Sequence, residues 1–389
     1  MKSKISTETT MTAALTLRQP GLFLAAALLT LASMPASAHD GGDSNGEYQQ
    51  TNLVSDLPGV AILQDTNLVN AWGMSFSSGS PFWISDNGTG LSSLYSVTND
   101  VDGVVQVTKL ALQVSIPGEG NVTGQLFNGT GAFHGDNFIF ASEDGTISGW
   151  RNALGTTAEV LATRSTAVSK AITLTSSNGQ PILLAANFAE GTLDAYGTNL
   201  TLLAQFADPT APAGYAPFNV QSLGGMVFVT FAKQDADKHD DVPGRGHGLI
   251  DVFDPQSGTF HRFATGKDAG GKLSEIDSPW GLALSPTNFG PHADQLLVGN
   301  FGSGTIMAFD TNGKFRGLLQ GRHDLPIVIE GLWGLAFGNG GRAGLPGTLY
   351  FTAGPGGESH GLFGSLEPVP KHAPGKGNDH NQDLGQNRD

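Results

Sequence analysis

Short apolar runs separated by turns rich in Gly, Asn and Pro recur along most of the chain. The stretch 278–310 contains three of them, at Trp280–Leu284, Leu296–Val298 and Thr305–Phe309. Runs of this length, rich in β-branched and aromatic residues and bounded by Gly and Asn, predict β-strands joined by hairpins. Such a three-strand unit cannot cover its own apolar faces, so we expect copies of it on either side.

Six copies of this unit can be recognised from their second strands. These strands are predicted at Phe82–Ile84, Phe138–Phe140, Ile182–Leu184, Val227–Val229, Leu296–Val298 and Leu349–Phe351. The 267 residues from Trp83 to Tyr350 cover five intervals, or roughly 53 residues per repeat, which is typical of propeller blades. A weaker outer strand follows each of the first five repeats, at Val104–Ile116, Ala158–Arg164, Leu202–Phe206, Phe260–Ala264 and Phe315–Leu319.

The sixth repeat ends near Leu366 without an outer strand, whereas a lone apolar run at Asn52–Val54 precedes the first repeat. Pairing of this run with the last repeat would close a ring and remove two exposed sheet edges. The sequence therefore predicts an all-β fold, a single six-bladed β-propeller over residues 52–368 closed by an N-terminal strand. Two β-sandwiches of three repeats are the alternative, although no linker-like composition separates the third repeat from the fourth.

Residues 1–38 have the pattern of a signal peptide. Arg18 precedes an apolar run over Leu22–Leu31, and Ala36–Ala38 supplies a small-residue cleavage site. The run is too short to span a bilayer comfortably. We therefore expect a secreted or periplasmic protein with no membrane anchor after cleavage of the signal peptide.

Polar sequence borders the propeller and predicts a flexible segment at 39–51 and a disordered tail at 369–389.

Composition narrows the class of partner. The formal charge of −15 argues against nucleic acid or an anionic membrane as a partner. The absence of cysteine excludes disulfides and thiolate metal sites. A monomer that binds a small molecule or an extracellular partner is expected.

Many short segments together resemble a known family. They are Asn52–Asp56, Asn70–Gly73, Ser85–Gly88, Glu143–Trp150, Ala213–Asn219, Pro279–Gly281, Gly299–Gly302, Gly331–Trp333 and His360–Gly364. With these segments the chain resembles an uncharacterised family of secreted bacterial proteins with NHL-like six-bladed β-propellers, some of which carry a PEP-type C-terminal sorting tail. The resemblance implies a fold and export but no activity. After Pro370 the chain lacks the apolar anchor and basic cluster of the sorted members.

The antiparallel order of strands predicts where a site would form. The starts of the first strands and the ends of the second strands should meet at one mouth of the central channel, where ligands bind in closed β architectures. The ligand-binding candidates at the first-strand starts are Asn70, Trp72, Lys170, Asn219, Trp280 and Trp333. The metal-binding candidates near the second-strand ends are Asp86, Glu143, Asn187 and Asn300.

Each set has two interpretations. Carboxylates and amides suit a divalent cation such as calcium, and propellers of the lactonase type hold a metal in a similar place, but Asn and Asp at hairpin ends also satisfy turns. Lys170 is expected to pair with Glu143 or Asp86. The three Trp-Gly steps would form either an aromatic rim for a flat ligand or wedges between closely packed strands.

Two functions follow from the predicted mouth. The first is binding of a small ligand or partner there. The second is metal-dependent hydrolysis or lysis of a small ester, lactone or saccharide, with the metal as Lewis acid. The fold can support either function, so the sequence leaves open whether the protein is an enzyme and which cofactor it uses.

Overall fold

The computed structural model describes residues 47–268 and 270–369. The predicted signal peptide, the predicted flexible segment as far as residue 46 and the predicted tail from residue 370 lie outside the described residues. Within the described ranges there is no α-helix, only short 3-10 segments. These are η1 (Asn87–Thr89), η2 (Phe133–Gly135), η3 (Asn152–Leu154), η4 (Gly290–His292) and η5 (Arg322–Asp324). No helix in the described part of the chain has the length and apolar character needed to cross a membrane.

The strands form six sheets, and each sheet has four equivalent positions that pair antiparallel. The innermost strands are β3 (Ala71–Ser75), β7 (Val122–Phe127), β11 (Ser169–Ser177), β15 (Tyr215–Leu223), β19 (Pro279–Leu284) and β23 (Leu332–Phe337). The second strands are β4 (Phe82–Asp86), β8 (Phe138–Ser142), β12 (Gln180–Asn187), β16 (Met226–Lys233), β20 (Leu296–Asn300) and β24 (Leu349–Ala353). The third strands are β5 (Leu91–Asn99), β9 (Thr146–Trp150), β13 (Thr192–Tyr196), β17 (Gly248–Asp254), β21 (Ile306–Phe309) and β25 (Leu362–Pro368). The outer strands are β6 (Val105–Ser115), β10 (Glu159–Thr163), β14 (Leu202–Phe206), β18 (Thr259–Thr265), β22 (Phe315–Leu318) and, in the last sheet, β1 (Tyr48–Ser55).

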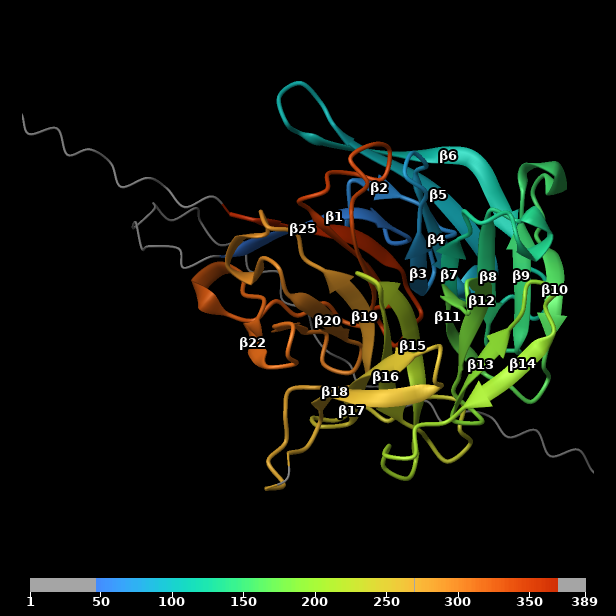
Figure 1. Cartoon of the computed structure of the whole chain (residues 1–389). Helices are drawn as coiled ribbons and strands as arrows, with labels where there is room; N and C mark the ends of the chain where they lie inside the picture. The colour runs from blue at the N-terminus through green and yellow to red at the C-terminus, as the bar shows by residue number, and fades with distance from the viewer. Residues whose placement is uncertain (1–46, 269, 370–389) are drawn as a thin grey trace, which may run out of the picture. The chain divides into compact units, whose positions relative to one another are not determined.

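The six sheets are the blades of a β-propeller (Figure 1). Their innermost strands contact one another in the order β3, β7, β11, β15, β19 and β23, and β23 contacts β3 again. This cyclic order confirms the predicted single propeller. It rules out two sandwiches, because the third and fourth blades pack together through β11 and β15 in the same way as the other neighbours.

The N-terminal strand closes the ring as predicted. β1 pairs antiparallel with β25, from Tyr48 opposite Pro368 to Ser55 opposite Leu362. The strand begins four residues before the predicted start at Asn52, because β25 extends to Pro368 and offers pairing partners along its whole length. A short strand, β2 (Leu63–Gln64), adds in parallel to β1 and forms the outermost edge of this sheet.

Apolar cores between adjacent blades hold the ring together. At the closing seam, Leu53 and Val54 of β1 pack in one cluster with Phe363 of the last blade and with Phe82 and Tyr95 of the first. All five side chains are fully buried. Burial of an apolar side chain of this size contributes about 1.5–3 kcal/mol, so β1 supplies packing between two blades as well as backbone hydrogen bonds.

Candidate functional site

A β-bulge interrupts the pairing of every innermost strand at an equivalent place. In β11, Ser169 and Ala171 pair with consecutive residues of β12, so Lys170 between them has no partner. A bulge re-aims the side chain of the extra residue. We call the first unpaired residues of the six strands the channel layer, which consists of Trp72, Thr123, Lys170, Phe218, Trp280 and Trp333.

The three tryptophans of the channel layer meet one another. Trp72 and Trp333 stack with ring centroids 3.6 Å apart. Trp280 presents its edge to both, at 6.3 Å from Trp72 and 5.9 Å from Trp333. All three are at least 94% buried, with exposures of 2%, 6% and 1% for Trp72, Trp280 and Trp333. They fill the space between the inner strands and do not form an exposed aromatic rim.

The glycines that follow the tryptophans allow neighbouring blades to approach closely. A Cβ atom on Gly73 would lie 2.5 Å from the carbonyl oxygen of Thr123 in the next blade, and one on Gly281 would lie 2.5 Å from that of Trp333. No larger residue fits without moving the backbone. The Trp-Gly steps therefore act in the close packing of strands, as one of the two interpretations of the sequence proposed.

The residues that directly follow the second strands form a further ring next to the channel layer. We call it the mouth layer, and it consists of Asn87, Glu143, Phe188, Gln234, Phe301 and Gly354. Its contacts cross from blade to blade. The amide of Asn87 donates to Glu143 Oε2 at 3.3 Å, Phe188 lies 5.4 Å from Phe218, and Phe301 stacks on Trp333 at 3.9 Å. One side of the mouth is therefore polar and the other aromatic.

Lys170 is the charged residue of the channel layer and is 1% exposed. Its Nζ atom donates to Glu143 Oε1 at 2.5 Å and to Asp240 Oδ1 at 3.1 Å, and it lies 5.3 Å from the ring centroid of Trp72. Burial acts to lower the pKa of Lys170, but the two carboxylates outweigh it and the pKa is raised. Lys170 is therefore an ammonium ion at neutral pH and acts as a hydrogen-bond donor, not as a nucleophile.

Asn70 organises the polar side of the mouth. Its φ of 47° is left-handed, a conformation that Asn adopts more readily than most residues. Asn70 Oδ1 accepts a hydrogen bond from the indole of Trp333 at 2.8 Å. Its amide nitrogen donates to Asn87 Oδ1 at 3.1 Å and to Glu358 Oε2 at 2.7 Å. Asn70 thus connects the channel layer, the mouth layer and the loop between β24 and β25.

Three carboxylates lie near the Lys170 ammonium ion at the mouth. Glu143 follows β8, Asp240 lies in the loop after β16, and Glu358 lies in the loop after β24. Burial acts to raise the pKa of Asp240, but Lys170 outweighs it and the pKa is lowered. Burial of the Glu358 carboxylate raises its pKa, against the hydrogen bond from Asn70. The cluster therefore has more negative than positive charge.

Of the four predicted metal ligands, Glu143 reaches the mouth, and the other three side chains pair within their own blades. Asp86 accepts from Ser93 at 2.6 Å, Asn187 donates to Asp194 at 3.0 Å, and Asn300 donates to Thr305 at 3.0 Å. Each of these three is the last residue of a second strand, one position before the mouth layer. Because neighbouring residues of a strand point in opposite directions, a difference of one position turns the side chain into the blade.

Five of the six ligand-binding candidates lie at the mouth or beneath it, and one, Asn219, misses the channel layer by one position. Asn70 and Lys170 contact the polar side of the mouth, and the three tryptophans lie beneath it. In the fourth blade the bulge places Phe218 in the channel layer. The amide of Asn219 instead donates to the carbonyl oxygen of Trp280. Sequence reasoning missed Phe218, Asp240, Phe301 and Glu358. The signal for Phe218 and Phe301 was a position next to a named candidate or immediately after a second strand, but the two acidic loop residues had none.

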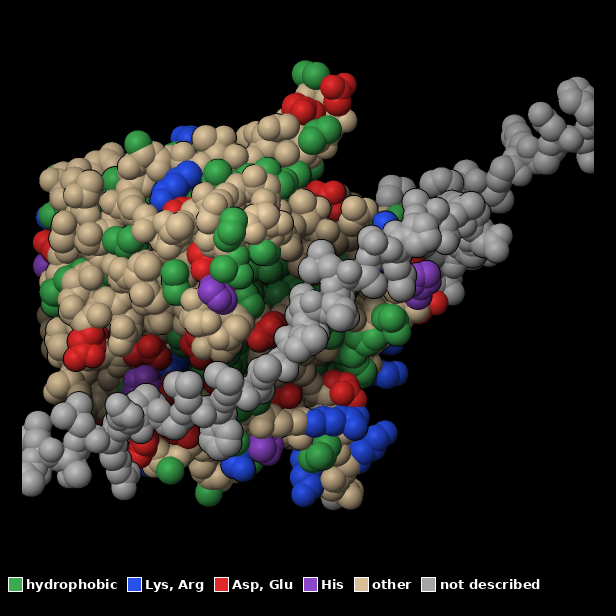
Figure 2. All heavy atoms as spheres, turned by 180° about the vertical axis from the view of Figure 1, so that it is seen from behind, with side chains coloured by type: hydrophobic (Ala, Val, Ile, Leu, Met, Phe, Trp, Pro, Cys, Tyr) green, Lys and Arg blue, Asp and Glu red, His purple; other side chains and the backbone are tan. Residues whose placement is uncertain are grey.

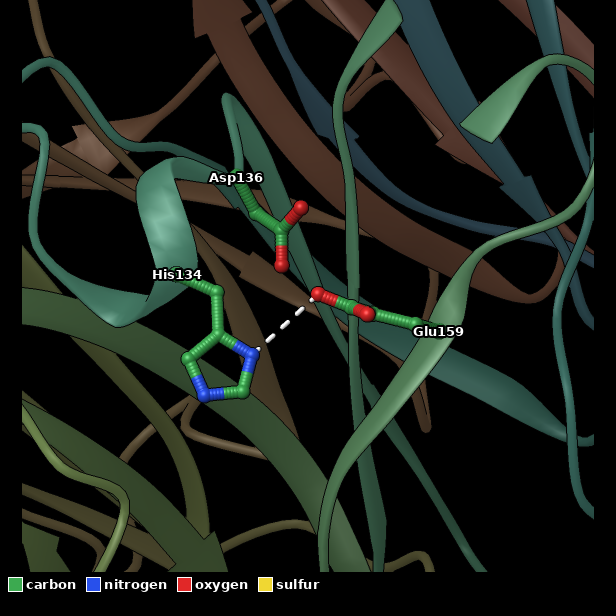
Figure 3. A group of neighbouring side chains, drawn as sticks. All are labelled: His134, Asp136 and Glu159. Atoms are coloured by element: carbon green, nitrogen blue, oxygen red, sulfur yellow. Dashed lines mark hydrogen bonds and ion pairs between the residues drawn. The ribbon is translucent and has the colours of Figure 1, made fainter. Parts of the chain in front are cut away.

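Two groups of His, Asp and Glu have ligand atoms within 4.8 Å of one another in the described ranges. One consists of Glu143, His239 and Asp240 at the mouth, next to Lys170. The other consists of His134, Asp136 and Glu159 (Figure 3). There Arg151 already bridges the two carboxylates, at 2.7 Å from Asp136 and 2.5 Å from Glu159. In each group a side-chain cation of the protein occupies the position between the carboxylates.

The relatives found by comparison are uncharacterized proteins, so they indicate no function for this chain. No family model matches the chain. An uncharacterized protein of Acanthamoeba polyphaga mimivirus is 28% identical over 312 residues, which cover 73% of this chain and 72% of that protein. A second uncharacterized mimivirus protein is 25% identical over 308 residues, covering 73% of this chain and 77% of that protein. Because these relatives are viral, they do not test the bacterial source, the secretion or the sorting tail of the resembled family, and these stay predictions.

Solved structures with a similar chain path include two lyases and one β-propeller domain. Streptogramin B lyase aligns with a TM-score of 0.45 and 11% identity over 84% of this chain and 98% of that chain. Virginiamycin B lyase from Staphylococcus aureus aligns with a TM-score of 0.45 and 14% identity, over 83% of this chain and 100% of that chain. The WD40 β-propeller domain of Doa1 aligns with a TM-score of 0.43 and 12% identity, over 82% of this chain and 96% of that chain. This likeness is one of fold alone.

Proposed function

We propose that the protein binds a small, neutral, polyhydroxylated molecule, such as a saccharide or a cyclic polyol, at the mouth of the channel. The observation that carries the proposal is the division of the mouth into a polar and an aromatic side above a buried ammonium ion. Asn87 and Glu143, which are both half-buried, supply amide and carboxylate groups on one side. The partly exposed ring of Phe301 supplies aromatic surface on the other.

The two sides match the two kinds of surface on a sugar ring. Amides and carboxylates exchange hydrogen bonds with hydroxyl groups. Phe301 is half-buried, and one of its faces rests on Trp333. This support fixes the ring, so its remaining apolar surface is available for the C–H face of a ligand. Lys170 has three N–H donors and two carboxylate acceptors, which leaves a donor for a ligand oxygen.

Charge favours a neutral ligand over an ion. The carboxylates of Glu143, Asp240 and Glu358 would repel an anion, and the ammonium of Lys170 would repel a cation close to Glu143. A ligand with hydroxyl groups and no net charge avoids both costs and still satisfies the polar groups at the mouth.

Metal-dependent hydrolysis or lysis of a small ester, lactone or saccharide is the second candidate function. It is favoured by one observation, the proximity of Glu143, His239 and Asp240 at the mouth. A divalent cation bound there would have to displace the Lys170 ammonium from Glu143 and Asp240. Calorimetric titration with calcium, manganese and zinc ions tests this. Tight binding of any of these ions by the wild type, lost in Glu143→Gln, would favour the enzyme over the binding protein.

Export is part of the proposal, because a polyol site at the mouth would then meet extracellular molecules. It is supported by the sequence pattern of residues 1–38. N-terminal sequencing of the protein recovered from the periplasm or the medium would show a start at His39. A mature protein that remains in the cytoplasm and begins at Met1 would contradict this part of the proposal.

Calorimetry of the chain from His39 onward with a panel of monosaccharides, disaccharides and inositols tests the main proposal. Phe301→Ala should weaken binding by about ten-fold, since a stacked aromatic contact contributes about 0.5–1.5 kcal/mol beyond its buried area. Glu143→Gln should weaken it as well. Phe315→Ala, an exposed phenylalanine on the outer strand of the same blade, and Glu119→Gln, an exposed glutamate, are the matched controls. Absence of binding across the panel, or equal binding by Phe301→Ala, would refute the proposal.

A further inference from the structure

A hollow lies away from the mouth, on the rim between the fourth and fifth blades. It has a volume of about 430 Å³ and is lined by β18, β21 and β22 together with residues 272–276 of the loop between β18 and β19. We call it the rim groove. Its size is within the range of small-molecule sites. It shares no lining residue with the channel layer or the mouth layer.

The floor of the rim groove is a row of aromatic rings. Phe263 and Phe309 lie 6.1 Å apart in an edge-to-face arrangement, and Phe309 and Phe315 lie 5.8 Å apart. The row begins in the core and ends at the surface, because Phe309 is 2% exposed and Phe315 is 43% exposed. Leu273 is also 43% exposed and lines the same groove. Two large apolar side chains on one concave surface give a ligand an apolar contact that scattered surface residues do not.

The edge of the rim groove carries positive charge in an otherwise acidic protein. Its lining contains Arg245, Arg262 and Lys272 and a single carboxylate, Glu275, whereas the whole chain has a formal charge of −15. The loop between β18 and β19 projects at the lower left of Figure 1. Lys and Arg side chains gather at the corresponding corner in Figure 2, at the lower right, because that view is from behind.

The three cations differ in their availability. Arg245 forms an ion pair with Glu275, and Arg262 bridges Asp208 and Asp251 at 2.7 and 2.5 Å. Within the described part of the chain, Lys272 has no ion pair with an acidic side chain. Lys272 is therefore the cation that would form an ion pair with a ligand. Arg245 is a second cation of the groove, and Glu275 partly neutralises its charge.

We propose that the rim groove binds a small amphipathic carboxylate, an aromatic or alkyl acid. The apolar part lies against Phe315 and Leu273, and the carboxylate pairs with Lys272. This binding is independent of the mouth, since the two sites have different residues and opposite charge. A neutral polyol suits the mouth and lacks the apolar body that the rim groove requires. An amphipathic anion suits the rim groove and is repelled by the carboxylates of the mouth.

Two competitors with the same phenylalkyl body, one ending in a carboxylate and one in a neutral hydroxyl, test the proposal on the chain from His39 onward. Anilinonaphthalene sulfonate serves as a fluorescent reporter of the groove, and phenylbutyrate and phenylbutanol compete for it. Phenylbutyrate should displace the reporter at about 1.5- to five-fold lower concentration than phenylbutanol, because an exposed ion pair contributes about 0.2–1 kcal/mol. Equal displacement by the two compounds would overturn the assignment of a carboxylate ligand.

Variants locate the binding. Lys272→Gln should remove the difference between the two competitors and leave phenylbutanol unchanged, whereas Phe315→Ala should weaken both compounds by at least about five-fold through lost apolar contact. Lys238→Gln and Leu203→Ala are matched controls, an exposed lysine and an exposed leucine outside the groove, and should bind like the wild type. Phe301→Ala at the mouth should also leave the displacement unchanged. If Lys272→Gln and Phe315→Ala behave like the controls, the rim groove is not the site.

Discussion

The indole N–H of Trp333 donates a hydrogen bond of 2.8 Å to Asn70 Oδ1, across the seam where the last blade meets the first. Gly354 makes room for this contact, since a Cβ atom there would lie 2.1 Å from Asn70 Oδ1. The same asparagine holds Asn87 and Glu358 at the mouth. Asn70 therefore links the closing seam of the ring to the candidate site.

Replacement of Asn70 should destabilise the protein. Asn70→Ala leaves the buried N–H of Trp333 without an acceptor, which costs about 1–3 kcal/mol, and places alanine at a left-handed φ, which costs about 1–2 kcal/mol more. Asn70→Gly removes the hydrogen bond but tolerates the backbone conformation. Urea unfolding should therefore rank wild type above Asn70→Gly and Asn70→Ala lowest. Equal stability of all three would show that the seam does not depend on this contact.

Removal of the closing strand should open the ring. Deletion of residues 39–56 takes away β1, exposes the edge of β25 and removes Leu53 and Val54 from the core at the seam. An unpaired edge strand associates readily with other chains. We expect a lower melting temperature by calorimetry and self-association by light scattering. A shorter deletion, of residues 39–46, ends before β1 and is the control. Unchanged melting and a monomer after the longer deletion would contradict the role of β1.

The pair of Lys170 and Glu143 should show strong coupling. Lys170→Met leaves a carboxylate that is 10% exposed without its cation, and breaking a buried ion pair in this way costs about 3–5 kcal/mol. The double variant Lys170→Met/Glu143→Gln should regain most of the stability.

The pH dependence of the wild type provides a second check on this pair. Because the pKa of Lys170 is raised in the folded protein, its pairing stabilises the fold below the pKa of an unfolded lysine, about 10.4. This contribution is lost as the pH rises through the folded pKa. Urea unfolding at neutral and alkaline pH should show the loss in the wild type and not in Lys170→Met. If the losses of stability in Lys170→Met and Glu143→Gln simply add up in the double variant, the two side chains are not coupled.

Asp251 should make the protein less stable as the pH rises from about 4 to about 7. Burial raises the pKa of Asp251 to about 7, against the attraction of Arg262 and with a contribution from neighbouring Asp208. The folded state then holds a proton that the unfolded chain releases at lower pH, so stability falls as the pH rises through this window. Asp251→Asn should reduce the fall by up to about 4 kcal/mol, from a shift of roughly three pKa units. Urea unfolding at pH 4 and pH 7.5 measures it, and parallel pH profiles of wild type and variant would contradict the assignment.

The repeat pattern was enough to predict the blades and their closure. The second strands, such as Phe138–Phe140, are short apolar runs with turn residues on both sides, and their signal is local. The predicted strand at Asn52–Val54 lies within β1, because a missing outer strand in one repeat and a spare strand elsewhere have one simple solution in a closed ring. Lys170 paired with Glu143, one of its two expected partners, because the antiparallel order of strands brings adjacent blades to the same mouth.

The details of the mouth depended on register. The bulge in each innermost strand decides which of two adjacent residues enters the channel, and in the fourth blade it selects Phe218 in place of Asn219. The same period of two sends Asp86 into its blade and Asn87 toward the mouth. A pattern of apolar and polar residues does not contain this choice, since Asp and Asn are equally acceptable at a hairpin end.

By itself the sequence determined the number of blades, the order of their strands and the ring closure, because each depends on local alternation and turn chemistry repeated along the chain. The tertiary structure alone decided the composition of the site. Asp240 and Glu358 reach Lys170 and Asn70 from loops of two other blades. Their convergence follows from the curvature of the ring and the bulges that aim each side chain. These are properties of the packed strands together, so no single segment of the sequence contains them.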